Sequence, residues 1–355
     1  MSRVHLPFLG RFSRFWTFAL FQFGAVLRRT VTACFAALLL LAWSDGVWAA
    51  PHCPAQLQDP GWVPVLPGID VLHGQWPALD AQTPDHMATT VVLSQGRQAV
   101  VLDPGPTRAH GMALRQWLQC RRGQRVVRLL NSHAHAENVL ANSAFGVPVA
   151  ATARTQSAMR QRCPDCLASL HHDLGAQALM GTRIVLPGQR LQDGSTLWAA
   201  GRHWQVLDMR DAHTESDLVL WSPTGRVVLA GPLVDGARLV LAQGTVVGWL
   251  RALQRIEALQ PQWLIGQHRV AGPDQVQGAL RGQRQALCAL VQQAWRGLEQ
   301  GWTEADALQQ SGLSADTAAA LLQRFNLLRA WREMEALWID QQPMPAVCSA
   351  PDVGR

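Results

Sequence analysis

The chain has 355 residues, of which 48% are hydrophobic and 16% charged, as expected for a folded globular protein with one large core or two small ones. The formal net charge is +6, but residues 1–50 hold five Arg and one Asp, so the rest of the chain carries only about +2. No arginine-rich stripe with interleaved aromatic residues remains there, which argues against nucleic-acid binding.

The N-terminus has the pattern of an export signal. Arg28 and Arg29 precede an apolar run from Ala33 to Trp43, and small residues suitable for cleavage follow at 47–50. The run is short for a membrane span. We therefore expect residues 1–50 to be a signal peptide or targeting segment, and the mature protein to be periplasmic or secreted, without a stable membrane span. An uncleaved N-terminal membrane anchor is the alternative.

The first part of the mature chain has the pattern of strands followed by a helix. The β-rich runs are broken by Gly, Pro and Asp, and they cover 63–65, 68–72, 89–93 and 99–102. A turn at Asp103–Pro106 ends this block, and helical spacing follows over 108–120. The next predicted strand, 126–130, leads directly into His133 and His135.

The middle of the chain alternates between short helices and strands. We predict helices over 138–145, 152–170 and 246–259, and strands over 147–150, 182–186, 196–199, 202–207 and 262–265. Two further strands, 217–221 and 226–230, form a predicted hairpin around a Ser-Pro-Thr-Gly turn.

After Gly272-Pro273 only helical patterns remain, over 275–298, 305–309, 315–323 and 327–338. Strands that alternate with helices and are followed by a helical tail predict a layered α/β or α+β fold. We expect a main domain over 51–272, a helical C-terminal subdomain over 273–347 and a tail over 348–355.

Six cysteines follow residue 50, and an even number in an exported protein predicts disulfides. Cys163 and Cys166 form a C-x-x-C motif, but no second motif exists to complete a four-thiolate zinc site. We expect a local disulfide between them, or a bridge from one of them to a distant cysteine. Redox activity of the pair is a further alternative.

Histidines recur where predicted strands end. His133 and His135 form an H-x-H pair directly after one strand, and such a pair can direct two imidazoles at one metal ion. His213 lies within Ala-His-Thr just before the predicted hairpin, and His268 follows Gly266-Gln267 at the end of another strand. An isolated H-x-H would be weak evidence, so the ordered set carries the argument.

Together with Asp103-Pro104-Gly105 and Ala230–Leu233, this set resembles the metallo-β-lactamase superfamily over residues 63–270. Segments at 140–145, 162–167 and 326–335 look most like periplasmic SoxH-like proteins and quinoprotein-relay zinc metallohydrolases. The resemblance implies an α+β fold, namely an αββα sandwich with metals held by loops at one edge of its two sheets. Here the sandwich would carry a C-terminal helical extension.

By this resemblance, the first zinc ion falls on His133, His135 and His213. Three neutral imidazoles with an open fourth position are typical of catalytic zinc rather than of a closed structural site.

The second metal site of the superfamily is degenerate in this chain. Glu137 and Asn138 replace its Asp and His, Pro232 replaces the bridging Asp, and Gln267 replaces the final His, with His268 displaced by one residue. We therefore expect one zinc ion.

The predicted function is hydrolysis of an ester, thioester or amide-type bond in a small molecule by zinc-bound hydroxide. In this hypothesis Glu137 orients the water or relays its proton, Asp103 supports the metal loops by hydrogen bonding, and His268 acts as a donor. Asp103 as a simple turn cap and His268 as a surface histidine are the alternatives. A different class of function is a non-catalytic protein of the same fold that binds a ligand or partner. The oligomeric state is not predicted.

Overall fold

We describe a computed structural model of the chain that covers residues 53–54, 57, 59–74, 89–235, 239–241, 243–314 and 316–349. The predicted signal segment, and the tail after residue 349, lie outside these described residues. Residues from Cys53 onward form one compact unit. Within the described ranges, no helix combines the length and the apolar character that a membrane span requires.

The first sheet has its seven strands in sequence order. They are β1 (Val63–Leu66), β2 (Ile69–Leu72), β3 (Thr90–Gln95), β4 (Gln98–Leu102), β5 (Arg125–Leu130), β6 (Val149–Thr152) and β7 (Gln189–Leu191). The pairs from β1 to β4 are antiparallel, whereas those from β4 to β7 are parallel. Because β4 and β5 run in the same direction, the residues after them leave the sheet side by side at one edge.

The second sheet has six strands in the order β13-β12-β11-β10-β9-β8. They are β8 (Thr196–Ala199), β9 (Arg202–Arg210), β10 (Ser216–Ser222), β11 (Val227–Gly231), β12 (Trp263–Gly266) and β13 (Val270–Ala271). All seven residues of β10 are buried. Helix α5 (Val246–Ala258) connects the parallel strands β11 and β12.

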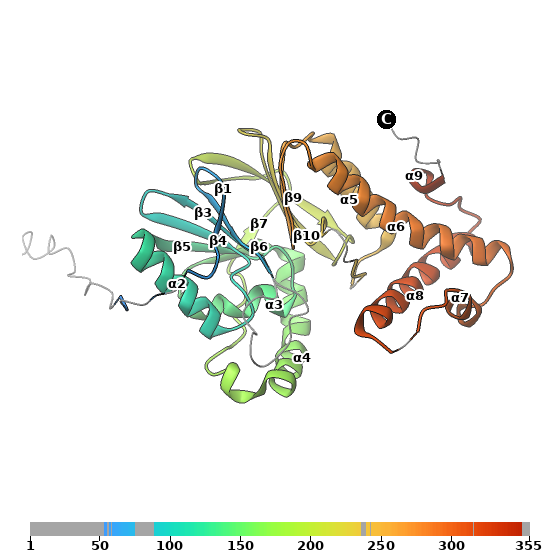
Figure 1. Cartoon of the computed structure of the whole chain (residues 1–355), viewed down its shortest axis with the longest axis horizontal. Helices are drawn as coiled ribbons and strands as arrows, with labels where there is room; N and C mark the ends of the chain where they lie inside the picture. Colours follow the sequence, from blue (N-terminus) through green and yellow to red (C-terminus); the bar gives the residue numbers. More distant parts are fainter. Residues whose placement is uncertain are drawn as a thin grey trace, which may run out of the picture. The chain divides into compact units, whose positions relative to one another are not determined.

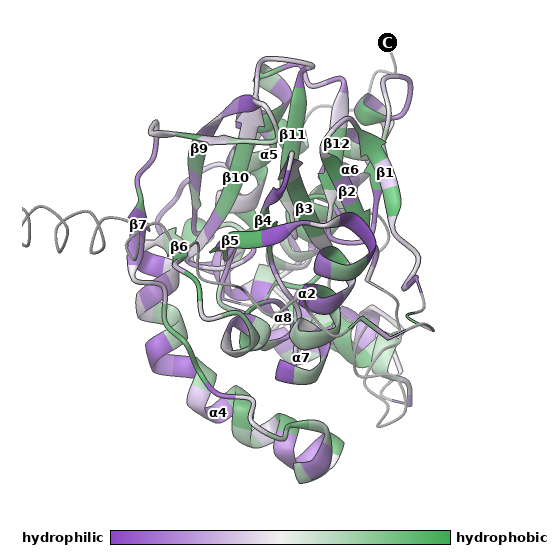
Figure 2. Cartoon of the chain, turned by 90° about the vertical axis from the view of Figure 1, so that its left-hand side faces the viewer, coloured by the Kyte–Doolittle hydropathy of each residue, from purple (hydrophilic) through white to green (hydrophobic). Residues whose placement is uncertain are grey.

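The two sheets pack face to face with helices on both outer faces (Figure 1). One apolar cluster joins the sheets, with Val91 and Leu93 from β3 against Leu218 and Leu220 from β10. A second cluster packs helix α2 (Arg108–Arg122) against the first sheet, and a third packs α5 against the second sheet. Figure 2 shows apolar residues concentrated on strands such as β11 and β12. The predicted α+β sandwich is confirmed.

Helices dominate the rest of the chain. Between β5 and β7 lie α3 (Ala136–Val139), the 3-10 helix η2 (Leu140–Ala144) and α4 (Ala153–Ala178). The C-terminal helices are α6 (Val276–Glu299), α7 (Glu304–Gln310), α8 (Ala318–Ile339) and α9 (Ala346–Ser349). Trp331 and Met334 of α8 are fully buried in the same cluster as α5, so these helices share a core with the second sheet.

Two predicted elements are wrong. Residues 182–186 do not form a strand; Ile184 and Val185 pack against neighbouring apolar clusters, and the sheet is extended instead by β7. The helices predicted over 315–323 and 327–338 are one helix, α8, because the side chain of Asn326 bonds to another segment and does not interrupt the helix backbone. Secondary-structure propensity alone predicts neither the irregular segment at 182–186 nor the unbroken helix α8, because tertiary packing decides both.

The prediction of disulfides is confirmed, but the pairing expected for the C-x-x-C motif is wrong. The bridges are Cys53–Cys120 and Cys288–Cys348, whereas Cys163 and Cys166 are free thiols on α4. Residues three apart on a helix have Cβ atoms about 5–6 Å apart, which is too far for a disulfide. Burial raises the pKa of Cys163 to about 12, so this thiol is also unsuited to redox exchange.

Candidate metal centre

His133 and His135 lie in the loop that follows β5, at the edge where β4 also ends. Leu102 pairs with Leu130 at the ends of these strands, and the Asp103 N–H donates to the Leu130 carbonyl at 2.9 Å. This pairing places Asp103 beside the start of the histidine loop. His133 is only 1% exposed, so its imidazole is withdrawn from solvent.

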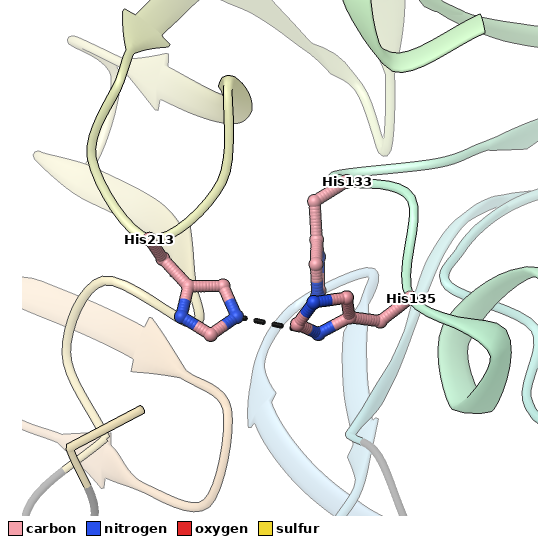
Figure 3. Close-up of side chains that lie close together, drawn as sticks. All are labelled: His133, His135 and His213. Carbon is pink, nitrogen blue, oxygen red and sulfur yellow. Dashed lines mark hydrogen bonds between the residues drawn. The ribbon is translucent and has the colours of Figure 1, made fainter. Parts of the chain in front are cut away.

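His213 reaches the same point from the second sheet, in the turn between β9 and β10. One nitrogen from each of the three histidines lies within 4.8 Å of the others. Figure 3 shows His213 facing His133 and His135 across the gap between the two loops. The structure therefore brings together, from opposite sheets, the three residues that the sequence predicted as ligands.

Hydrogen bonds determine which nitrogen of His133 is free. Its Nδ1 lies 2.8 Å from Ser132 Oγ, and that hydroxyl donates its own proton to the Asp103 carboxylate. Ser132 Oγ must therefore accept a hydrogen bond from His133 Nδ1–H. The lone pair of the neutral ring is left on Nε2.

The other two histidines are fixed in the same way. His213 Nδ1 lies 2.8 Å from the Val240 carbonyl, which can only accept, so the lone pair of His213 is on Nε2. His135 Nε2 lies 3.1 Å from Gln243 Oε1 and donates to it, which leaves the lone pair on Nδ1. His213 Nε2 and His135 Nδ1 are 3.3 Å apart (dashed line in Figure 3).

This donor set fits a zinc ion. Zn–N bonds of about 2.0–2.1 Å in tetrahedral geometry bring ligand nitrogens to about 3.3–3.4 Å from each other, as His135 and His213 already are. The set as a whole spans up to 4.8 Å, a difference within reach of side-chain rotation. Each ring also donates the N–H of its other nitrogen to a protein oxygen, the arrangement that fixes metal-binding histidines.

Burial sets the charge state of the ligands. It lowers the pKa of His133 well below its usual value and that of His213 to about 3, so both rings are neutral and able to bind a metal at pH 7. Burial also acts to lower the pKa of His135. The Glu137 carboxylate, 3.5 Å from His135 Nδ1, outweighs this effect, so the pKa of His135 is raised. Without a metal, a proton on this ring is therefore favoured.

A buried aspartate supports each metal loop. Asp103 accepts from the Ser132 N–H at 2.8 Å, and burial raises its pKa to about 7. Asp217 accepts from the N–H groups of His213 and Thr214, both at 2.9 Å, and burial also raises its pKa to about 7. Each carboxylate organises backbone amides next to a ligand rather than facing the cavity.

The histidines open into a cavity of about 320 Å³. Its polar wall contains Glu137, Gln267 and His268, and the Nδ1 of His268 is hydrogen-bonded to Asp235. Its apolar wall is built by Pro232, Val240, Trp249, Ala318 and Leu322. Three of the residues that replace second-site ligands, Glu137, Pro232 and Gln267, thus face the same space as the three histidines.

Of the predicted site residues, Glu137 and His268 line the cavity, while Asp103 lies beneath it and acts through Ser132. Sequence reasoning missed Ser132, Asp217, Val240 and Gln243. Ser132 and Asp217 were detectable in the sequence, because each is a polar residue close to a predicted ligand and at one end of an apolar strand. Ser132 comes just after β5, and Asp217 lies at the start of β10. Val240 was not detectable, because it contributes a backbone carbonyl.

No family model and no curated protein sequence matches this chain, but solved structures do. A metallo-β-lactamase from Hirschia baltica is 15% identical, with a TM-score of 0.50 over 64% of this chain and 97% of that one. A β-lactamase domain protein from Burkholderia ambifaria is 17% identical, with a TM-score of 0.59 over 84% and 91%. The stereoselective inverting sec-alkylsulfatase Pisa1 from Pseudomonas sp. is 16% identical, with a TM-score of 0.60 over 80% and 52%.

The closer likeness to SoxH-like proteins stays a prediction, since identities of this size report the fold alone. The two packed sheets with helices on their outer faces agree with these structural matches. The chain has the metallo-β-lactamase fold.

Proposed function

We propose that this protein is a hydrolase that uses one zinc ion held by His133 Nε2, His135 Nδ1 and His213 Nε2. The observation that carries the proposal is the convergence of one nitrogen from each of three histidines within 4.8 Å, with those of His135 and His213 only 3.3 Å apart. Such an approach is repulsive unless a cation or a proton lies between them. When bound, zinc would lower the pKa of a coordinated water to about 7 and polarise a substrate oxygen.

Glu137 is the proposed proton acceptor. Burial raises its pKa, but His135 more than offsets this, so the net pKa is lowered and the carboxylate is ionised at neutral pH. Its Oε1 lies 3.5 Å from His135 Nδ1 and faces the cavity. A carboxylate in this position can orient a water molecule and take its proton.

Two further cavity residues supply donors for the charge that develops on a substrate oxygen. His268 is oriented by its Nδ1 contact with Asp235, and Gln267 carries a neutral amide. We assign His268 and Gln267 to this role because both line the cavity that the histidines open into. Asp103 is a positioning residue, since it touches the ligand only through Ser132.

The cavity favours a neutral substrate with an apolar part. Two carboxylates, Glu137 and Asp235, are among the described residues that line it, and they would repel an anionic sulfate or phosphate ester. Five apolar residues form the remaining wall. We therefore propose a small ester, thioester or amide-type substrate, cleaved at its carbonyl.

We also propose that the protein acts in the periplasm or outside the cell. The bridges Cys53–Cys120 and Cys288–Cys348 support this location, because disulfides form and persist in oxidising compartments.

Metal analysis combined with a hydrolysis panel tests the proposal. Purified protein from residue 51 onward should contain one zinc per chain and should hydrolyse at least one class of ester, thioester or amide. His213→Ala should lose both properties, whereas His172→Ala, whose imidazole is 90% exposed, should keep both. Protein without stoichiometric zinc would overturn the metal site, and zinc-loaded protein that is inactive on the whole panel would favour a binding function.

A further inference from the structure

Two of the three histidines take their orientation from one segment, which we call the ligand-orienting loop (residues 239–241 and 243–245). The Val240 carbonyl accepts from His213 Nδ1 at 2.8 Å, and Gln243 Oε1 accepts from His135 Nε2 at 3.1 Å. These contacts decide which nitrogen of each ring faces the metal position. A displacement of this loop would therefore reach both ligands at once.

On its inner side the loop lies directly against the His213 turn. The Gly244 N–H donates to the His213 carbonyl at 3.1 Å, and the Thr245 N–H donates to the Asp211 carbonyl at 2.9 Å. The approach is so close that a Cβ on Gly244 would lie 1.7 Å from the Ala212 carbonyl oxygen. The loop therefore has no room to shift toward the site.

On its outer side the loop is held by α8. Asn326 Oδ1 accepts from the Leu241 N–H at 2.9 Å, and its Nδ2 donates to the Leu239 carbonyl at 2.6 Å. One helical turn further on, Arg329 Nη2 donates to the Gly244 carbonyl at 2.9 Å. These contacts satisfy backbone groups on both sides of the residues that hold the histidines.

A third side chain of α8 fixes the end of the loop. Glu333 accepts from the N–H groups of Val246 at 2.6 Å and Val247 at 3.0 Å, the first residues of α5. A carboxylate at a helix N-terminus is favourable because those amides have no partner within the helix. Asn326, Arg329 and Glu333 are spaced by three and four residues and so lie on one face of α8.

The same face continues to the cavity. Leu322 and Ala318, one and two turns before Asn326, line the cavity. Helix α8 thus contacts the site in two ways, through the substrate-facing wall and through the loop that orients the ligands. It belongs to the helical subdomain predicted at the C-terminus, outside the part of the chain that carries the histidines.

We propose that Asn326 and Arg329 are positioning residues for the metal, acting through the ligand-orienting loop. This inference rests on the proposed zinc site. With these contacts in place, Val240 and Gln243 hold His213 and His135 in the tautomers that bind the ion. Without them the loop loses its hydrogen bonds to Asn326 and Arg329, and both rings gain freedom to rotate.

The test measures zinc affinity by chelator competition and the visible spectrum of the cobalt(II) form. Asn326→Ala and Arg329→Ala should each weaken zinc binding about tenfold and alter the cobalt spectrum. Arg329→Lys keeps a donor for the Gly244 carbonyl and should recover most of the affinity. The matched control is Arg332→Ala on the same helix, whose guanidinium bonds Glu304 of α7 instead and whose loss should leave the affinity within twofold.

The outcomes separate this inference from the proposed function. Wild-type protein that binds no zinc would overturn both. Wild-type protein that binds zinc, with folded Asn326→Ala and Arg329→Ala variants of unchanged affinity and cobalt spectrum, would overturn the role of α8 alone. If Asn326→Ala fails to fold, as judged by circular dichroism, the result for Arg329→Ala decides, since Arg329 makes one hydrogen bond to the loop and Arg329→Lys keeps its charge beside Glu333.

Discussion

His213 Nε2 lies 3.3 Å from His135 Nδ1, and when both rings are neutral each of these nitrogens presents a lone pair, because the other nitrogen of its ring donates to a protein oxygen. The two residues come from different sheets of the sandwich and are 78 positions apart in the chain. The fold therefore brings together two groups that repel each other unless a cation or proton separates them.

Asp103→Asn should weaken zinc binding by about tenfold or more with little loss of folding stability. In the wild type, His133 Nδ1–H donates a hydrogen bond to Ser132 Oγ, and the Ser132 hydroxyl donates one to the Asp103 carboxylate. This arrangement leaves the lone pair of His133 on Nε2. An amide NH₂ facing Ser132 would turn its hydroxyl toward His133 and favour a proton on Nε2. Chelator competition measures the effect; an affinity equal to that of the wild type would show that Asp103 only caps a turn.

Glu137→Gln should lower kcat about a hundredfold while zinc content stays at one per chain. The amide keeps the size of the side chain but cannot accept a proton from water. Steady-state kinetics on the best substrate of the panel, together with metal analysis of the same sample, provides the measurement. A loss of zinc in this variant would instead make Glu137 a ligand.

Gly244→Ala should lower the free energy of unfolding by at least about 2 kcal/mol and weaken zinc binding, because the added Cβ would lie 1.7 Å from the Ala212 carbonyl oxygen. Gly278→Ala is the control, since that position on α6 is exposed and an added Cβ there would meet nothing within 4 Å. It should raise stability by about 0.5–1 kcal/mol through helix propensity. Urea denaturation compares the two; equal effects would contradict the close approach.

Burial raises the pKa of Glu333 above 4.5, although the Val246 and Val247 amides act in the opposite direction. A carboxyl group with a raised pKa binds its proton more tightly in the folded state, so its contribution to stability is greatest below the ordinary pKa and falls as pH rises. The stability of the wild type relative to Glu333→Gln should therefore decrease from about pH 4 to about pH 7. Urea denaturation across this range tests the sign, and a difference that grows with pH would refute it.

Cys348→Ser should lower the free energy of unfolding by about 4 kcal/mol, because the Cys288–Cys348 bridge closes a loop with a sequence separation of 60. Cys166→Ser, which removes a free thiol, is the control and should change stability little. Melting curves with and without reductant give the comparison. Reductant should destabilise the wild type and the control, and a Cys348→Ser protein as stable as the wild type would contradict the prediction.

The sequence by itself determined the elements of this protein whose signals are local. The sandwich and the ligand set with His213 were implied by the resemblance to the metallo-β-lactamase superfamily, whereas the strand that ends at Leu130 and the H-x-H pair after it follow from a short apolar run and two side chains. The even number of cysteines predicted disulfides in the same way. The strand and the histidine pair are encoded in residue types at short spacing, where periodicity and composition are informative.

Only the tertiary structure decided the features that depend on partners far along the chain. The ring tautomers of His213 and His135 depend on the Val240 carbonyl and on Gln243. Every residue has a backbone carbonyl, so the sequence does not reveal which one accepts from His213. The continuity of α8 depends on where the Asn326 side chain finds its partners, 85 and 87 residues away. Cys163 is a free thiol because the helical backbone of α4 holds it apart from Cys166, and packing of that helix buries it. Burial and long-range hydrogen bonds, which packing creates, set these outcomes.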